Sequence, residues 1–404
     1  MDTEKLPSME VTQRRPTGIP RTIWALGFVS MFMDISSEMI HSLLPVFLVT
    51  VLSTSATYVG LIEGVAEATA LITRVFSGAL SDWLGKRKSL ALAGYALGTL
   101  TKPLFALASG AGLVFAARCL DRLGKGVRGA PRDALVADAT PPHLRGAAYG
   151  LRQSLDTVGA FLGPLLAIIL MVATAGRFRT VFWSALAPGL LAVSILAFAV
   201  REPTTPSAKS ARHPIRFRHI AHLGAAYWMV VAFGSVFTLA RFSEAFLLLR
   251  AEDVGMAAGM VPVILVTMNL FYSLTAYPVG HLSDRLGRTG LIAVGLVILI
   301  ASDLTLAISK TGFHVAAGAA LWGLHMGLTQ GLLSAMVADT ARQDLRGTAF
   351  GMFSMASGIA MLAASLIAGF LWDLFGAPAP FFTGAIFAAW ALIGFLSLRW
   401  RLKR

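Results

Sequence analysis

Residues 78–90 read GALSDWLGKRKSL, and residues 280–292 carry a closely related segment, GHLSDRLGRTGLI. A second pair keeps the same order, with VADATPPHLRGAAYG at 136–150 and VADTARQDLRGTAFG at 337–351. The offsets are 202 and 201 residues, and segments that recur in the same order at nearly the same spacing indicate an internal duplication. The chain is therefore predicted to consist of two halves built on one plan.

The composition is that of a protein that uses a lipid bilayer as its solvent. Of the 404 residues, 56% are hydrophobic and only 14% are charged, far from the usual balance of a soluble chain. The single cysteine, Cys119, cannot form an internal disulfide or a cysteine metal cluster. The bases behind the formal net charge of +13 are not gathered on a soluble face with aromatic residues between them, so no nucleic-acid partner is expected.

Sequence motifs of enzymes are missing. The tripeptide GKG at 124–126 lacks the spacing of a phosphate-binding loop and the Ser or Thr that follows one, and no HExxH or nucleophile-elbow pattern occurs. The chain is therefore not expected to be an enzyme.

Twelve apolar segments are long enough to cross the bilayer, for which a helix needs about 20 residues. They lie at 22–50, 57–82, 89–108, 111–136, 147–175, 180–200, 222–248, 259–283, 290–309, 314–338, 347–374 and 380–398. We predict an all-α integral membrane protein with twelve transmembrane helices in two pseudo-symmetric six-helix bundles. The predicted divisions are an N-terminal arm at 1–21, bundles at 22–200 and 220–398, a linker at 201–219 and a tail at 399–404.

The positive residues of the loops predict the orientation. Most of them lie on the side that carries both termini, and the other side has only Arg177, Arg179, Arg250 and Lys310. Because Lys and Arg resist translocation, both termini are predicted to be cytoplasmic, in a multi-pass protein of the cytoplasmic (inner) membrane.

The duplicated segment resembles the signature loop of the major facilitator superfamily. The matching residues are Gly78, Asp82, Gly85, Lys86 and Arg87 after the second span, and Gly280, Asp284, Arg285, Gly287 and Arg288 after the eighth. The resemblance implies the major facilitator fold, alternating access, and a conformational latch made by these residues on the cytoplasmic side. Trp83 and Thr289 stand where the family usually has a basic residue, which predicts a weaker latch.

A second resemblance, in the fifth span, concerns the direction of transport. Gly150, Gly159, Gly163 and Pro164 match the core of the motif found in the family's antiporters, especially drug/proton exporters. The resemblance implies export in exchange for protons. Ordinary close packing of helices explains the same glycines, so both interpretations stay open.

The fourth span carries five bases on one face. Arg118, Arg122, Lys125, Arg128 and Arg132 are separated by steps of 4, 3, 3 and 4 residues, which place them on one side of a helix. Arg118 matches the family's fourth-helix motif, which the resemblance links to proton coupling. We expect Arg118 and Arg122 in proton coupling, and the other three as a basic lining that attracts an anionic cargo. The alternative is a fully paired salt-bridge network.

The first span carries a second polar face. Asp34, Glu38 and His41 share it through steps of 4 and 3 residues. A carboxylate in a membrane cavity can bind a proton in one conformation only, so Asp34 and Glu38 are predicted to couple protons together with Arg118 and Arg122. The same three side chains suit a divalent metal ion, and this alternative stays open.

The expected function is secondary active transport of a small organic solute by a monomer, as proton-coupled export driven by the proton gradient and without a cofactor. The partners are the solute, protons and the lipid bilayer. Candidate cavity residues are His41, Glu67, Lys125, Arg128, Tyr227, Arg241, Glu244, Asn269, Tyr272, His325 and Gln330. Two alternatives are a divalent metal ion exporter that uses Asp34, Glu38 and His41, and a transporter-like sensor that does not transport.

Overall fold

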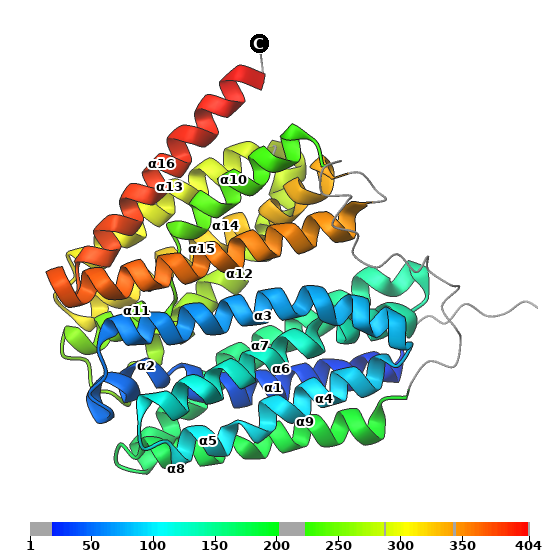
Figure 1. Ribbon diagram of the computed structural model, residues 1–404, viewed down its shortest axis with the longest axis horizontal. Coiled ribbons are helices and arrows are strands. Elements are labelled where there is room, and N and C mark those ends of the chain that lie inside the picture. Colours follow the sequence, from blue (N-terminus) through cyan, green and yellow to red (C-terminus); the bar gives the residue numbers. More distant parts are fainter. Residues whose placement is uncertain (1–17, 202–222, 287, 342–344, 403–404) are drawn as a thin grey trace, which may run out of the picture.

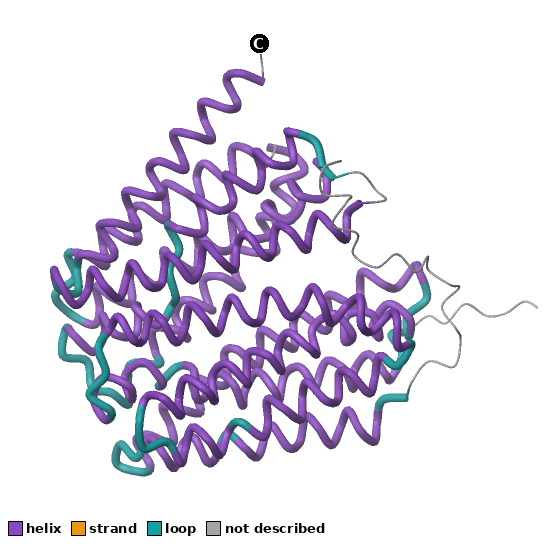
Figure 2. Tube along the Cα trace, viewed as in Figure 1, coloured by secondary structure: helices purple, strands orange, loops and turns teal. Residues whose placement is uncertain are grey.

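The computed structural model describes residues 18–201, 223–286, 288–341 and 345–402. Within these ranges the regular structure is helical (Figure 2), and the helices form twelve membrane-crossing spans. The predicted fold class is therefore confirmed. The predicted linker at 201–219 and arm at 1–21 lie largely outside the described residues.

Each half contributes six spans, and four of the twelve are broken into shorter helices. The first half comprises α1 (Arg21–His41) continued by α2 (Leu44–Val46) and a π-helical turn (Phe47–Val51), α3 (Ala56–Leu84), α4 (Arg87–Leu100) with α5 (Lys102–Leu107), α6 (Ala111–Asp138), α7 (Arg145–Ala173), and α8 (Phe178–Ser184) with α9 (Leu186–Ala199). The second half comprises α10 (Ala225–Leu239) with α11 (Ala245–Asp253), α12 (Val263–Leu286), α13 (Arg288–Ala307), α14 (Gly312–Thr340), α15 (Arg346–Phe375) and α16 (Ala379–Leu402).

Two of the breaks have a local cause in the sequence. Pro45 stands at the start of α2 and Pro103 at the start of α5. Proline lacks the N–H that would continue the preceding helix and is well tolerated in a first turn. The break between α10 and α11 contains no proline, and it carries Arg241 and Glu244.

The charged helix α6 is enclosed by protein. Seven spans among the described residues are long and apolar enough to cross a membrane, and α6 is not one of them. Four of its charged residues, Arg118, Asp121, Arg122 and Arg128, are buried, because α6 packs between α3 and α4. This placement keeps the charges away from lipid, where they would be costly.

The two halves meet along α3 and α15, which run side by side at their boundary (Figure 1). Glycines bring the two backbones into contact. A Cβ atom on Gly60 would lie 2.1 Å from the carbonyl oxygen of Ser365, and one on Gly369 would lie 2.4 Å from that of Ala56. Only glycine fits at such distances, as is typical of close helix contacts in membranes.

One end of the bundle is closed and the other is divided. We call the end that carries residues 18–21 the terminal side, and the opposite end the far side. One hydrophobic core includes far-side residues of both halves, among them Phe47 and Phe246, and within the second half it continues toward the terminal side. On the terminal side each half has its own cluster, one around Tyr95 and the other around Tyr227. The halves are therefore joined at the far side and separated at the terminal side.

A carboxylate also joins the halves at the far side. Asp373, near the end of α15, accepts hydrogen bonds from the backbone N–H groups of Ala56 (3.0 Å) and Thr57 (2.8 Å) and from the Thr57 hydroxyl (2.5 Å). The first turn of a helix has free N–H donors and a positive dipole end. Asp373, which belongs to the second half, accepts hydrogen bonds from these N–H groups and places its negative charge at the positive end of α3.

Candidate functional site

A cavity of about 410 Å³ lies between the two halves, and we call it the central cavity. Its charged lining residues come from the first half, while Asn269 and Tyr272 on α12 line it from the second. The charged residues are Asp34, Glu38, Glu67, Arg74, Lys125, Arg128, Arg132 and Asp156. Such a volume suits a small organic molecule.

A smaller cavity of about 250 Å³ adjoins the first, and we call it the inner cavity. Glu38, Glu67 and Lys125 line both cavities. Its other charged residues are His41, Arg122, Arg241 and Glu244. Arg241 and Glu244 reach it because they lie in the break between α10 and α11.

A buried ion-pair network lies behind the cavities. Arg118 binds Glu63 of α3 with two hydrogen bonds of 3.0 and 2.7 Å, and both side chains are about 2% exposed or less. Lys102 donates to Asp121 (2.9 Å) and to Ser37 (3.1 Å). Arg118, which we expect in proton coupling, lines neither cavity. Its guanidinium points instead into the contact between α6 and α3.

His41 connects this network to the cavities. Its Nδ1 lies 3.2 Å from Oε2 of Glu38, and its Nε2 lies 3.7 Å from Oε2 of Glu63. Glu38 is thereby linked through His41 and Glu63 to Arg118. A change of charge on Glu38 at the cavity wall is consequently felt by the buried network.

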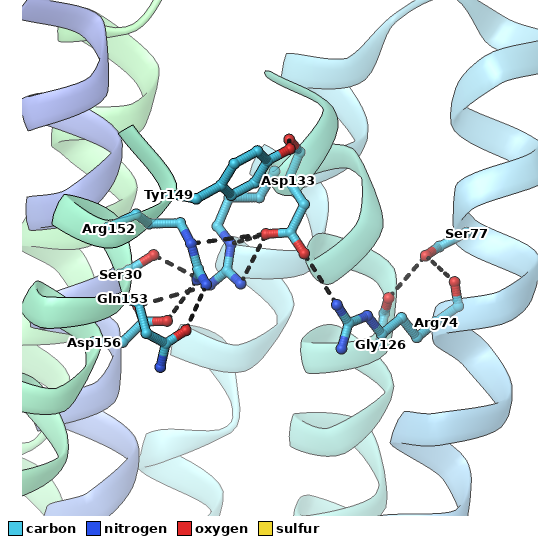
Figure 3. A network of polar contacts seen from close by, with 10 residues as sticks. Ser30, Arg74, Ser77, Gly126, Asp133, Tyr149, Arg152, Gln153 and Asp156 are labelled. Atoms are coloured by element: carbon cyan, nitrogen blue, oxygen red, sulfur yellow. Dashed lines mark hydrogen bonds and ion pairs between the residues drawn. The ribbon is translucent and has the colours of Figure 1, made fainter. Parts of the chain in front are cut away.

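Figure 3 shows a second network, whose members Arg74, Arg132 and Asp156 line the central cavity. Asp133 of α6 contacts Arg74 (3.0 Å) and Arg132 (3.2 Å), and Arg152 of α7 contacts Asp156 (2.5 Å). The Tyr149 hydroxyl donates to the backbone carbonyl of Asp133 (2.7 Å), and Arg132 also donates to Ser30 (3.1 Å). Arg132 therefore has carboxylate partners, unlike the free base of the predicted lining, and it shares Asp133 and Asp156 with Arg74 and Arg152.

The five bases of α6 thus fall into two groups. Arg118, Arg122 and Arg132 have carboxylate partners, and the partner of Arg122 is Glu67 at 3.2 Å. Lys125 and Arg128 form no ion pair with any residue that the structure describes. The structure therefore shows a paired network for three bases and leaves two cations at the cavity.

The glycines of the antiporter-like motif lie directly against the acids of α1. A Cβ atom on Gly159 would lie 2.5 Å from the carbonyl oxygen of Met31, and one on Gly163 would lie 2.6 Å from Cβ of Glu38. Pro164 is buried in the same helix, whereas Gly150 has no neighbour within 4 Å of such an atom. The motif therefore brings α7 into backbone contact with the part of α1 that carries Asp34 and Glu38.

The predicted latch is described only in part. Gly85 adopts a left-handed conformation (φ 63°) that ends α3, and Gly78 packs against Ala130 of α6. Arg87 pairs with Asp138 in the same half, and Lys86 is exposed. The side chains of Asp82, Gly280, Asp284, Arg285, Gly287 and Arg288 lie outside the described residues.

Three predicted cavity residues of the second half lie elsewhere. Tyr227 is fully buried and its hydroxyl donates to the carbonyl of Ala349 (2.8 Å). His325 is also fully buried, with Nδ1 2.8 Å from the carbonyl oxygen of Gly295. Gln330 is half-buried on α14. None of the three lines the central or the inner cavity, and the hydrogen bonds of Tyr227 and His325 are to helices of their own half.

The predicted metal ligands are not gathered into a site. Among the described residues no group of three His, Cys, Asp or Glu side chains is placed to hold a metal ion. His41 contacts Glu38 and Glu63, and no hydrogen bond or ion pair joins Asp34 to any of these three described residues.

Sequence reasoning missed two residues that the geometry singles out. Tyr95 of α4 lies under the guanidinium of Arg128, with Cζ 4.8 Å from the ring centroid. Asp373 binds the start of α3 across the boundary. The sequence offers no signal for either, since each depends on a helix distant in the chain.

Comparison with known proteins identifies similar chains. A family model described as Major Facilitator Superfamily matches residues 26–250 and 229–404. The chain is 33% identical over 365 residues to an uncharacterised MFS-type transporter of Methanocaldococcus jannaschii, covering 88% of this chain and 89% of that protein. It is 30% identical over 189 residues to the multidrug resistance protein MdtH of Edwardsiella ictaluri, covering 46% and 44%.

Solved structures share the fold at lower identity. The nucleoside transporter NupG superposes with a TM-score of 0.79 at 13% identity, over 93% of this chain and 99% of that one. A bacterial homologue of the human lysosomal transporter Spinster, in an inward-facing conformation, gives 0.75 at 16% identity, over 96% and 98%. These likenesses concern the fold alone.

Proposed function

The chain belongs to the major facilitator superfamily and is a secondary transporter rather than an enzyme, and on this premise we propose that it exports a small organic solute in exchange for protons. We further propose that the protein lies in the cytoplasmic membrane with both termini in the cytoplasm. The terminal side, where the halves are separated, then faces the cytoplasm.

One observation carries the proposal. Asp34 and Glu38 line the central cavity between the halves, at the point where Gly159 and Gly163 hold α7 against α1. The groups that would bind the proton and the space that would hold the solute therefore coincide. A proton and a solute that compete for one cavity are exchanged for each other when the cavity alternates between the two sides. The name of the partly similar MdtH, a multidrug resistance protein, also favours export.

The inner cavity offers a way to couple a proton to movement of the halves. Glu244 of the second half faces Glu38, Glu67 and His41 of the first. Carboxylates of like charge repel strongly where water is scarce. A proton on Glu38 removes part of this repulsion, and so changes the free energy with which the halves approach each other.

The proposal predicts solute accumulation driven by a pH gradient. Purified protein in liposomes with an acidic lumen is offered organic anions, cationic drugs or Mn²⁺, and lumenal pH is followed with a trapped dye. We expect one organic class to accumulate while the lumen becomes more alkaline. Accumulation that ignores the gradient, or no organic accumulation at all, contradicts proton exchange, and accumulation of Mn²⁺ alone supports the metal exporter.

A second prediction concerns alternating access. Asp373→Asn weakens the charged hydrogen bonds that close the far side, by about 2 kcal/mol, or about thirtyfold in the equilibrium between conformations. Spin labels at exposed positions Arg177 and Ala257, in a Cys119→Ser background, report the width of the far side by pulsed electron spin resonance. We expect a larger population of long distances in the variant.

The control for this prediction is Asp253→Asn. Asp253 lies on the same side, but its partner Arg250 belongs to the same half. Its substitution should leave the distance distribution unchanged. Equal distributions for Asp373→Asn and the parent protein would show that Asp373 does not hold the far side closed.

A further inference from the structure

We propose that the central cavity binds an amphoteric solute, with its acidic group held by Arg128 and Lys125 and its basic group at Asp34. This inference deepens the proposed function, and it rests on that function only in taking the bound solute as the transported one. It follows from which charges at the cavity are left over after all ion pairs have been formed.

Arg128 is a buried cation that forms no ion pair with a described residue, and the nearby carboxylates that interact with its charge include Asp34 and Asp121. Arg128 is only 4% exposed, and its Nη1 is buried without a hydrogen-bond partner. The ring of Tyr95 compensates part of the charge from one face, at 4.8 Å. An unpaired buried guanidinium is costly. An oxyanion bound beside Arg128 would supply the negative partner that the guanidinium lacks.

The position of Arg128 is fixed by its neighbours on α4. A Cβ atom on Gly98 would lie only 3.1 Å from Nη1 of Arg128, and one on Gly94 would lie 2.7 Å from its backbone nitrogen. These glycines leave room for the guanidinium beside Tyr95. The cation is therefore built into the packing of α4 against α6 and lines the central cavity from there.

Lys125 supplies a second cation one helical turn earlier. It is exposed to the space of both cavities and forms no ion pair with a described residue. Residues three positions apart lie on one face of a helix. A carboxylate or phosphate in the central cavity can therefore meet Lys125 and Arg128 together.

Asp34 supplies the opposite charge. It lines the same cavity from α1 and has no hydrogen bond or ion pair in the part of the chain that the structure describes. The charged groups that face it are Asp156 on α7 and Lys125, Arg128 and Arg132 on α6, of which Asp156 and Arg132 are engaged in the second network. An ammonium group bound at Asp34 would separate it from the two free cations.

Exchange with protons favours a solute that carries both charges. A basic group at Asp34 and a proton on Asp34 exclude each other, which is the competition that exchange requires. A solute with only an acidic group would draw a proton into the cavity with it and so favour cotransport. Ala70, Leu71 and Ala160 give the cavity apolar wall for the body of the solute.

Binding of matched probes to purified protein in nanodiscs tests this inference without any gradient. The probes are glycine, leucine and phenylalanine, each compared with its amide, which is a cation, and with its deaminated acid, which is an anion. By calorimetry we expect at least one amino acid to bind at least tenfold more tightly than its amide and its acid. Equal affinities within every series, or no binding in any, would overturn the proposal.

Variants assign the two ends of the solute. Lys125→Gln and Arg128→Gln should each weaken binding of the amino acid and its deaminated acid at least tenfold and leave the amide unchanged. Asp34→Asn should weaken the amino acid and the amide and leave the acid unchanged. Arg177→Gln, which removes an exposed base of the first half that lines neither cavity, is the control and should change none of them.

If Arg128→Gln proves unstable, Lys125→Gln still tests the inference, because the exposed side chain of Lys125 contributes little to packing. A full effect of Arg177→Gln, or none of Lys125→Gln, would show that the free cations do not bind the acidic group. Loss of proton exchange alone would leave these affinities intact, so the two proposals fail separately.

Discussion

Arg118→Met is expected to lower the free energy of unfolding by about 3–5 kcal/mol. Arg118 and Glu63 form a two-bond pair at 3.0 and 2.7 Å, and the side chains are 2% and 1% exposed. Removing the guanidinium leaves a carboxylate in the protein interior with only the 3.7 Å contact to His41. An unpaired buried charge costs far more than the pair itself contributes.

Two further variants make this prediction specific. Arg118→Met combined with Glu63→Gln removes both charges, and should recover most of the lost free energy in a denaturant titration of the purified protein. Arg74→Met breaks a pair whose arginine side chain is 58% exposed, and should cost less than about 1 kcal/mol. If the double variant were as unstable as Arg118→Met alone, the pair would not be the source of the loss.

The fold could be predicted from the sequence because its determinants are local. A membrane helix satisfies its own backbone hydrogen bonds, so an apolar segment of sufficient length predicts a span by itself. Pro45 and Pro103 even mark two of the breaks. The break between α10 and α11 is different, because residues 240–244 contain neither proline nor glycine. Contacts with other helices stabilise it, and these have no local signature.

The candidate site was predictable only up to the faces of single helices. The spacing of the charges on α6 predicted that they face the protein interior, but it did not predict that Arg118 and Arg128 contact different neighbours. Arg118 meets Glu63 from α3, whereas Arg128 meets the Tyr95 ring from α4. The residue that each side chain contacts depends on the rotation of the helices about their axes and on their displacement relative to one another. Helical periodicity carries no information on either.

The same limit explains the residues of the second half. Asn269 and Tyr272 line the central cavity from α12, while Tyr227 and His325 are buried in the packing of their own half. All four are polar side chains within apolar spans. Their type is compatible with either environment, and only the orientation of each helix toward the boundary distinguishes them.

Glu38→Gln is expected to abolish accumulation driven by the proton gradient. With one pH unit across the membrane and the membrane potential held at zero, exchange of one proton for one solute sustains about a tenfold concentration ratio, since 1.4 kcal/mol corresponds to a factor of ten. Glutamine keeps the shape of Glu38 but binds no proton, so the ratio should return to about one. Exchange of labelled for unlabelled solute, which needs no gradient, should continue.

Glu38 is the most sensitive position for this test because it joins three features of the molecule. It lines both cavities, it contacts His41 and through it the Arg118–Glu63 pair, and it faces Glu244 of the second half. A permanent neutral side chain fixes the weaker repulsion across the inner cavity, so the halves no longer respond to pH. Glu252→Gln, outside both cavities, is the control and should retain the tenfold ratio. A Glu38→Gln protein that still accumulated solute tenfold would place the coupling elsewhere, with Asp34 as the next acid to test.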